Sequence, residues 1–78
     1  SLHLERLFNL SRAEARLAGL LAEGLSLEDC AVFLNVSRHT VRTQIKSVFI
    51  KTGTNRQSDL VRILLSSVAA FAQSPEKD

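Results

Sequence analysis

The stretch Ser37–Thr52, SRHTVRTQIKSVFIKT, decides the fold because it predicts a helix with two different faces. Apolar residues recur along one face at helical spacing, namely Val41, Ile45, Val48 and Phe49. The other face carries cations and hydroxyls and no carboxylate, namely Arg42, Thr43, Lys46 and Ser47, with Arg38 and His39 at its entrance. The first face requires a hydrophobic core. The second is either solvated surface or a binding face for an anionic partner, and the preceding segment decides between these.

That preceding segment predicts a short helix and a tight turn. Ser26 is a suitable N-cap for a helix over residues 27–34, whose acidic first turn suits the helix dipole. Residues expected on the inner side of this segment are Cys30, Ala31, Phe33, Leu34 and Val36. Asn35 tolerates a left-handed backbone, and Ser37 can cap the following helix. Helix, three-residue turn and helix are the parts of a helix-turn-helix motif.

A further helix is predicted before the motif, over about residues 12–23. Ser11 and Glu14 have the spacing of a capping box, and Gly24 stands where a left-handed residue closes a helix. Glu14 has two interpretations. It is either only part of the cap, or it also forms a buried ion pair, for which Arg56 is the candidate partner.

The last helix is predicted over about residues 56–72. Gly53 is expected to end the preceding helix, and Thr54 with Gln57 has the form of a second capping box. The apolar stripe of this helix is expected to consist of Leu60, Val61, Leu64, Leu65, Val68 and Phe71. Two apolar residues lie off this stripe and are expected to be exposed in a monomer, namely Ile63 and Ala70. The predicted fold is therefore all-α, a four-helix bundle with helices at about 12–23, 27–34, 38–52 and 56–72.

The 78 residues suffice for one small domain with a single core. Residues 1–10 are expected to be a linker or packing segment from a missing N-terminal domain, residues 11–72 the helix-turn-helix domain, and residues 73–78 a disordered tail. The chain begins without Met, so we expect it to be a fragment of a longer protein. A single cysteine, no signal peptide and no apolar run of membrane length favour a cytoplasmic protein.

Charge is distributed unevenly along the chain, although the net charge is only +2. Residues 1–35 carry three arginines against five acidic residues, a net charge of −2. Residues 36–68 carry six cations against Asp59 alone, a net charge of +5. An acidic half followed by a basic half suits a domain that turns one face to a polyanion.

No constellation of residues suggests catalysis or metal binding. The two histidines are far apart in sequence, and Cys30 is predicted to lie in a helix core. There is no carboxylate pair, no nucleophile with a nearby base and no metal-ligand spacing. We therefore predict no enzyme activity, no catalytic residue, no metal and no cofactor.

Taken in order, these motifs resemble the LuxR-type helix-turn-helix domain, also called the GerE domain, over about residues 10–66. The family's opening Leu-Thr/Ser-x-x-Glu matches LSRAE at 10–14, its turn matches AEGLS at 22–26, and its signature Ser-x-x-Thr-Val-Lys/Arg matches SRHTVR at 37–42. Further matching positions are Ala31, Leu34, Lys51, Gly53 and Arg56. Residues that depart from the usual family pattern are Cys30, Gln44, Ile50 and Thr52.

The resemblance implies four helices, of which the third enters the major groove of DNA and the fourth pairs two chains. The residues carried over to positions that touch base edges are Arg42, Thr43 and Lys46. Their chemistry agrees, since Arg and Lys commonly bind guanine and a Thr methyl can pack on thymine. Residues better placed for phosphates are Arg38, His39, Thr40, Ser47 and Lys51. The helix expected to form the dimer contributes Leu60, Ile63, Leu64 and Ser67.

Two functional hypotheses remain open. The first is sequence-specific binding of double-stranded DNA by the output domain of a bacterial transcriptional regulator, as a homodimer on an inverted repeat at the nucleoid. The promoter-reading region of a sigma factor is a variant of this hypothesis. The second is a protein-interaction module that binds RNA polymerase or a partner regulator without reading DNA. Neither involves a membrane.

Overall fold

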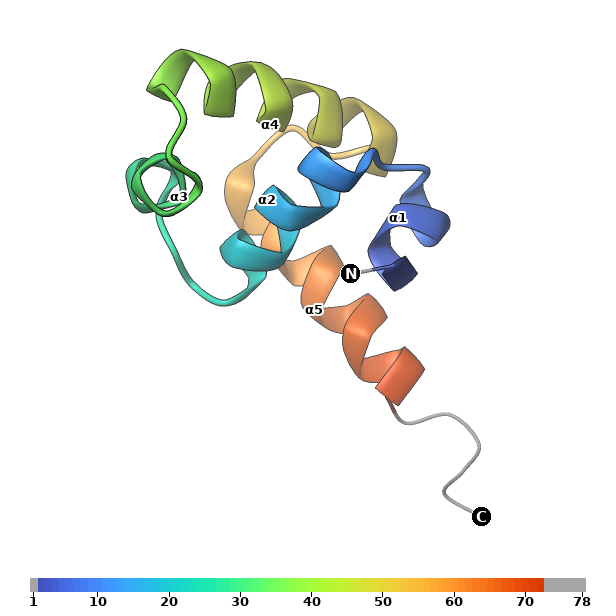
Figure 1. Ribbon diagram of the computed structural model, residues 1–78. Helices are drawn as coiled ribbons and strands as arrows, with labels where there is room; N and C mark the ends of the chain where they lie inside the picture. Colours follow the sequence, from blue (N-terminus) through green and yellow to red (C-terminus); the bar gives the residue numbers. More distant parts are fainter. Residues whose placement is uncertain (1, 73–78) are drawn as a thin grey trace.

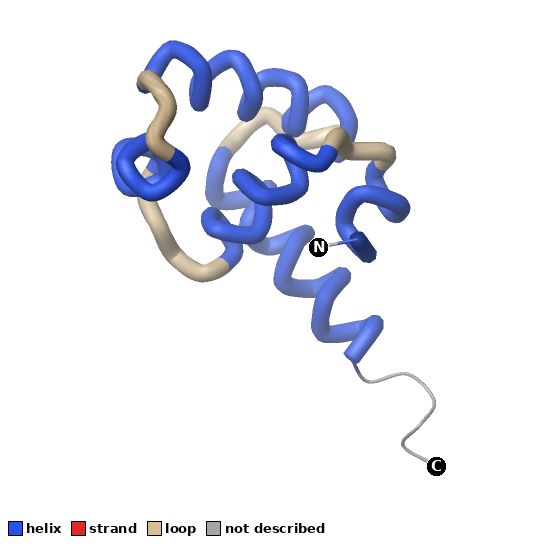
Figure 2. Tube along the Cα trace, in the orientation of Figure 1, coloured by secondary structure: helices blue, strands red, loops and turns tan. Residues whose placement is uncertain are grey.

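A computed structural model describes the backbone of residues 2–72 and the side chains of residues 3–67. Helices joined by short loops, without any strand, make up the described part, which confirms the all-α prediction (Figures 1 and 2). The helices are α1 (Leu2–Phe8), α2 (Arg12–Ala22), α3 (Leu27–Leu34), α4 (Arg38–Thr52) and α5 (Gln57–Ala72). Four of them match the predicted helices to within one residue at each end. The predicted tail over 73–78 and the side chains of Val68, Ala70 and Phe71 lie outside the described residues.

The segment over residues 1–10, predicted to connect and pack, contains a helix of its own. Asn9 adopts a left-handed backbone with φ of 58°, and the Leu10 amide donates to the Glu5 carbonyl at 2.9 Å, which closes α1. Leu4 and Leu10 are buried in the common core, and α1 packs against α2. The four predicted helices therefore gain a fifth, because burial of leucines stabilises a short helix that local propensity alone would leave marginal.

The helix ends follow local hydrogen-bonding signals. Ser11 and Ser26 both form complete capping boxes, with Glu14 and Asp29 respectively, and Ser37 caps α4 by accepting from the Thr40 amide. Two left-handed residues complete the pattern, because Asn35 closes α3 with φ of 58° and Gly53 closes α4 with φ of 72°.

The capping box predicted for the last helix is not formed. The helix α5 begins at Gln57, and the Arg56 carbonyl accepts the amide of Leu60. The Thr54 hydroxyl lies 2.9 Å from the Thr52 hydroxyl instead. The two threonines thus bond to one another across the turn that Gly53 makes.

One hydrophobic core joins all five helices. Its buried members are Leu4, Leu10, Ala15, Leu17, Ala18, Leu21, Cys30, Ala31, Val41, Ile45, Val48, Leu60 and Leu64. Each fully buried leucine contributes about 1.5–3 kcal/mol by leaving water. Figure 1 shows α4 across one end of the molecule, α3 at one side and α5 running away from the opposite end. Within residues 2–72, no helix combines the length and hydrophobicity that crossing a membrane requires.

The inner face of α3 is narrower than predicted. Cys30 and Ala31 are buried, but Phe33 is 67% exposed, and Val36 in the following turn is also exposed. Phe33 lies about 100° around the helix from the centre of the buried stripe, since each residue turns the helix by that angle. The eight-residue helix buries only one stripe against its neighbours, so Phe33 stays outside.

Candidate nucleic-acid interface

The helix α4 presents two faces, as its sequence predicts. Val41, Ile45 and Val48 are buried, with exposed fractions of 1%, 5% and 0%. The three residues predicted to contact bases are all exposed on the outer side, namely Arg42, Thr43 and Lys46. No acidic residue occurs anywhere in α4. This outer face is therefore cationic, and it is held rigidly by the core beneath it.

Ile50 belongs to the same outer face, and sequence reasoning assigned it no role. It follows Thr43 by seven residues and Lys46 by four, the spacings that align residues along one side of a helix. Its side chain is 80% exposed. Helical spacing in the sequence was enough to predict this position. An isoleucine is unexpected there because the other residues of this face are polar. It adds an aliphatic group to the far end of the cationic face.

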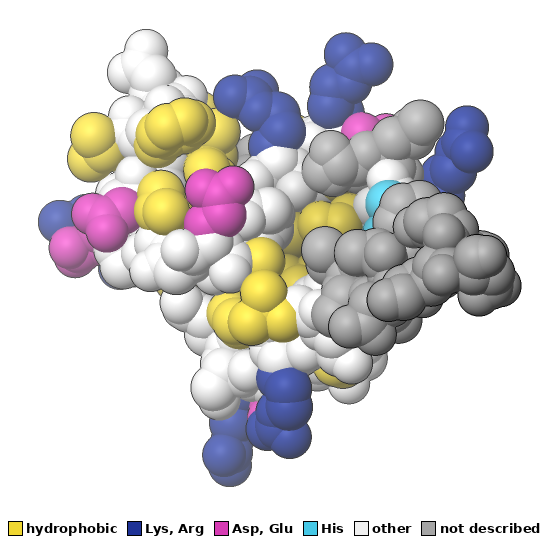
Figure 3. Space-filling model, turned by 90° about the horizontal axis from the view of Figure 1, so that it is seen from below, with side chains coloured by type: hydrophobic (Ala, Val, Ile, Leu, Met, Phe, Trp, Pro, Cys, Tyr) yellow, Lys and Arg dark blue, Asp and Glu magenta, His cyan; other side chains and the backbone are white. Residues whose placement is uncertain are grey.

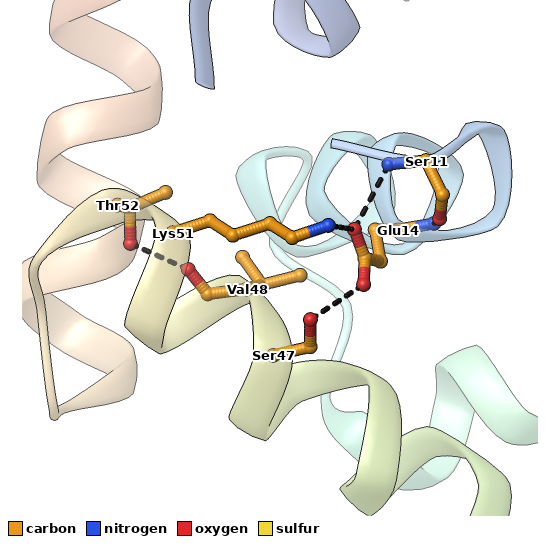
Figure 4. Close-up of polar contacts among 6 residues, drawn as sticks. All are labelled: Ser11, Glu14, Ser47, Val48, Lys51 and Thr52. Carbon is orange, nitrogen blue, oxygen red and sulfur yellow. Dashed lines mark hydrogen bonds and ion pairs between the residues drawn. The ribbon is translucent and has the colours of Figure 1, made fainter. Parts of the chain in front are cut away.

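One side of α4 is fixed to α2 by the carboxylate of Glu14 (Figure 4). Lys51 Nζ donates to Glu14 Oε1 at 2.7 Å, and Ser47 Oγ donates to Glu14 Oε2 at 2.6 Å. The Ser11 amide also donates to Oε1, at 2.9 Å, as part of the capping box. Glu14 is thus both a cap and an ion-pair partner. The prediction that Arg56 is the ion-pair partner of Glu14 is wrong. Arg56 is exposed, and Lys51 forms the ion pair instead.

The environment of Glu14 shifts its acidity strongly. Its side chain is only 12% exposed, and this desolvation acts to raise the pKa of the carboxyl. The hydrogen bonds from Lys51, Ser47 and the Ser11 amide, with the charge of Lys51, outweigh it and lower the pKa from 4.5 to about 2. The carboxylate is therefore ionised throughout the physiological range and binds α2 to α4 continuously.

This arrangement divides the five residues predicted to contact phosphates. Arg38 and His39 are exposed at the start of α4, and Thr40 is half-buried there. Ser47 is half-buried and uses its single hydroxyl proton on Glu14, so it has none to donate to a phosphate. Lys51 is engaged by the same carboxylate, and its side chain is 33% exposed. The start of α4 is thus the more accessible part of the predicted phosphate surface.

A second carboxylate meets α4 at its first turn. Arg38 lies 3.4 Å from Glu28 of α3, and the two side chains are 66% and 70% exposed. The same corner has a hollow between the starts of α3, α4 and α5, whose polar lining is Ser26, Glu28, Arg38, Arg42 and Gln57. Sequence reasoning missed Ser26 and Gln57 as neighbours of Arg42. Local pattern carries no signal for this, because three separate helix starts converge there.

The residues predicted for dimer formation also divide. Leu60 and Leu64 are fully buried in the core of their own chain, so they are not available to a second chain. Ile63 and Ser67 are half-buried, and Leu65 is 50% exposed. The error arises because the stripe that faces the core and the stripe that pairs helices both look apolar in sequence.

Among the described residues, no three histidine, cysteine or acidic side chains are grouped so that they could hold a metal ion. Cys30 is fully buried, as predicted, and burial together with the charge of Asp29 raises the pKa of its thiol. A thiol in this state is protonated and inaccessible, which suits core packing.

The comparison with protein families agrees with this geometry. The sequence model of "Bacterial regulatory proteins, luxR family" matches residues 8–64, which include α2, α3, α4 and the first half of α5. No individual curated protein and no solved structure gives a significant match. The family is one of DNA-binding regulatory domains and not of enzymes. The chain belongs to the luxR family of bacterial regulatory proteins, whose helix-turn-helix domain binds DNA in the regulation of transcription.

Proposed function

We propose that this domain recognises specific DNA sequences by inserting α4 into the major groove. Arg42, Thr43 and Lys46 then face the edges of the bases. Arginine and lysine can bind guanine O6 and N7, and the threonine methyl can pack on a thymine methyl. The observation that carries the proposal is the division of α4 into a buried apolar face and an exposed cationic face without any carboxylate.

The backbone of the DNA would be held mainly at the start of α4. Arg38 and His39 are exposed there, and Thr40 keeps its own hydroxyl proton because it accepts from Ser37 Oγ at 3.0 Å. Lys51 has two further N–H donors beyond the one that binds Glu14, so a phosphate contact from it would be shared with the α2–α4 junction. Ser47 donates its hydroxyl proton to Glu14 and is therefore not part of the proposed DNA contact.

Two chains would bind together on an inverted repeat, inside the bacterial cytoplasm at the nucleoid. A symmetric pair places its two recognition helices about 34 Å apart, one turn of B-DNA. The surface of α5 that remains for pairing is the side with the half-buried Ile63 and Ser67, four residues apart. Contact with RNA polymerase is part of the same proposal, since a bound regulator acts on transcription through that enzyme.

A binding-site selection from random duplexes tests the reading of bases. Wild-type protein should enrich two half-sites in inverted orientation. Lys46→Ala should lose preference at particular base pairs, at a cost of about 1–3 kcal/mol per lost contact. Arg38→Ala is the matched control, because loss of a phosphate contact should weaken binding to all sequences alike and reduce the salt slope by about 1. Identical sequence preferences for wild type and Lys46→Ala would refute base reading by this residue.

A dimer test uses the same duplexes. Ser67→Arg places two like charges close together if α5 pairs around a twofold axis. It should lower affinity for the full inverted repeat and leave affinity for an isolated half-site unchanged. An unchanged affinity for the full inverted repeat would contradict pairing through this side of α5.

A further inference from the structure

Ile50 is the exception among the hydrophobic residues of α4, a helix that the structure describes at every residue. It is 80% exposed. The others are buried or half-buried, namely Val41, Ile45, Val48 and Phe49. A single exposed aliphatic residue is normal at a protein surface, so exposure alone assigns Ile50 no role. A role is indicated by its position on α4.

Ile50 lies on the side of α4 directly opposite the core. Each residue turns an α-helix by about 100°, which places Ile50 about 180° around the helix from the middle of the buried stripe. By the same geometry it lies within about 40° of Thr43 and of Lys46. All three residues are exposed. They therefore form one row along the outermost line of α4, with Ile50 at its far end.

The length of this row matches a short run of base pairs. Ile50 follows Thr43 by seven residues, which corresponds to about 10 Å along the helix axis. Base pairs of B-DNA are stacked about 3.4 Å apart, so the row covers about three of them. Some recognition helices contact bases from positions spread over about seven residues. A helix lying along the major groove can thus contact bases with Ile50 as well as with Thr43.

The junction of α4 with α2 leaves this row uncovered. Ser47 and Lys51 bind Glu14 from one flank of α4, about 60° and 100° around the helix from Ile50. The last turns of α4 therefore have a flank that is fixed to α2 and an outer side that is free. No residue of α4 is acidic, so this helix carries no charge that repels the phosphates bordering the groove.

Other exposed hydrophobic side chains have different surroundings. Figure 3 views the molecule from the side opposite α4, and hydrophobic and acidic side chains both appear there on the side where α3 lies. Ile50 instead shares its helix face with exposed cations, namely Arg42 and Lys46. It is thus continuous with the surface that suits DNA, and DNA is the partner expected to cover it.

We infer that Ile50 is a specificity-determining residue that contacts the 5-methyl group of a thymine in the major groove. The inference rests on the proposed function, because it requires α4 to lie in that groove. Isoleucine has no hydrogen-bonding group in its side chain, and the thymine methyl is the apolar group that bases present in the major groove. Since Lys46 stands between Thr43 and Ile50, this thymine lies beyond the base pair that Lys46 contacts.

Replacement of thymine by uracil tests the contact, because it removes the methyl group and keeps every hydrogen-bonding group of the base. The probe is a single half-site enriched by the wild-type chain, with uracil at one thymine at a time. At one position, uracil should weaken binding of wild type about three- to fivefold, as expected for one buried methyl group. The same uracil should have no effect on binding of Ile50→Ala, whereas Ile50→Val should keep most of the effect.

Leu7→Ala is the matched control, because it shortens a half-exposed leucine of α1 and should respond to uracil as wild type does. Ile50→Ala should not lower the free energy of unfolding in urea, since the core does not use Ile50 and alanine favours a helix. Any change in its DNA binding is then a property of the contact and not of the fold.

The outcomes separate this inference from the proposed function. A wild-type chain that enriches no sequence would overturn the proposed function and the inference together. An enriched half-site at which no uracil position distinguishes wild type from Ile50→Ala would overturn the inference alone. A loss for Ile50→Ala on the full inverted repeat but not on the half-site would show that Ile50 contacts a second chain, and it would also overturn the inference.

Discussion

Two carboxylates meet cations of α4, one at each end of the helix, and they differ in nearly every physical respect. Glu14 of α2 binds Lys51 at 2.7 Å, receives two further hydrogen bonds and is 12% exposed. Glu28 of α3 stands 3.4 Å from Arg38, and both side chains are more than half exposed. The charges are alike, so burial and the number of donors make the difference. The Glu14 contact is part of the fold, whereas the Glu28 contact is one that solvent and salt weaken.

The comparison teaches which cations of α4 are free for DNA. If Lys51 moved away from Glu14, a largely buried carboxylate would lose its ion-pair partner, which costs free energy. An arginine in an exposed pair can exchange its carboxylate for a phosphate at little cost. The last turns of α4 therefore attach it to α2, and we expect its first turn to be the part that is free to contact phosphates of DNA.

The largest expected effect is on the junction of α2 and α4. Glu14→Ala should lower the free energy of unfolding by about 3 kcal/mol, because Lys51 and Ser47 lose their acceptor and the Ser11 amide loses its cap. Urea denaturation measures it. Glu28→Ala is the matched control, at less than about 0.5 kcal/mol for an exposed pair. Similar losses of stability in Glu14→Ala and Glu28→Ala would contradict the conclusion that only the Glu14 contact stabilises the fold.

Acid should weaken the same junction. The folded-state pKa of Glu14, about 2, lies below its ordinary value of 4.5, so its contribution is complete above pH 4.5 and is lost as the pH falls towards 2. The free energy of unfolding should fall by about 2 kcal/mol more in wild type than in Glu14→Gln between pH 6 and pH 3. Denaturation series at several pH values measure this difference. Parallel curves for the two proteins would contradict the lowered pKa.

Substitution of Ser47 distinguishes a structural role of its side chain from a role in contacting phosphate. Ser47→Ala should cost about 1.5 kcal/mol of stability, because a hydrogen bond to a buried charged group is lost. Its affinity for DNA, measured with folded protein, should equal that of wild type. An affinity lowered about tenfold would show that the hydroxyl does donate to a phosphate. Thr40→Ala is the useful comparison, since a reduced DNA affinity is expected there.

The smallest effect concerns the exposed contact. Glu28→Gln should change stability by less than about 0.5 kcal/mol and raise DNA affinity about threefold, because Arg38 is freed for a phosphate. Fluorescence anisotropy at low salt measures it. In an Arg38→Ala background the same substitution should have no effect on affinity. A rise that persists in that background would mean that Glu28 acts only through long-range repulsion.

The predicted fold was accurate where the signals were local. Ser11, Ser26 and Ser37 cap helices, and Asn35 and Gly53 close them, because each acts on backbone groups within a few residues of itself. Periodicity likewise placed Val41 and Ile45 on the buried side of α4. The helix α1 was missed, since its stability comes from leucines that bind a core made by other segments.

The candidate site was less predictable, and for a related reason. The pattern identified Arg42, Thr43 and Lys46 as one outer face, which the structure exposes. It could not tell that Leu60 and Leu64 turn inward to this chain's own core, because an apolar stripe looks the same whichever surface covers it. Phe33 was placed inside for the same reason, although a short helix has room for only one buried stripe.

The sequence by itself determined the helix ends at Ser11, Ser26, Asn35, Ser37 and Gly53, the division of α4 into two faces and the membership of the luxR family. These depend on spacings of three to seven residues, which the chain fixes before it folds. Only the tertiary structure decided the partner of Glu14, thirty-seven positions from Lys51, and the surface left to Phe33. Such choices depend on which helices come to lie together, and charge or hydrophobicity alone does not specify a partner at that distance in the chain.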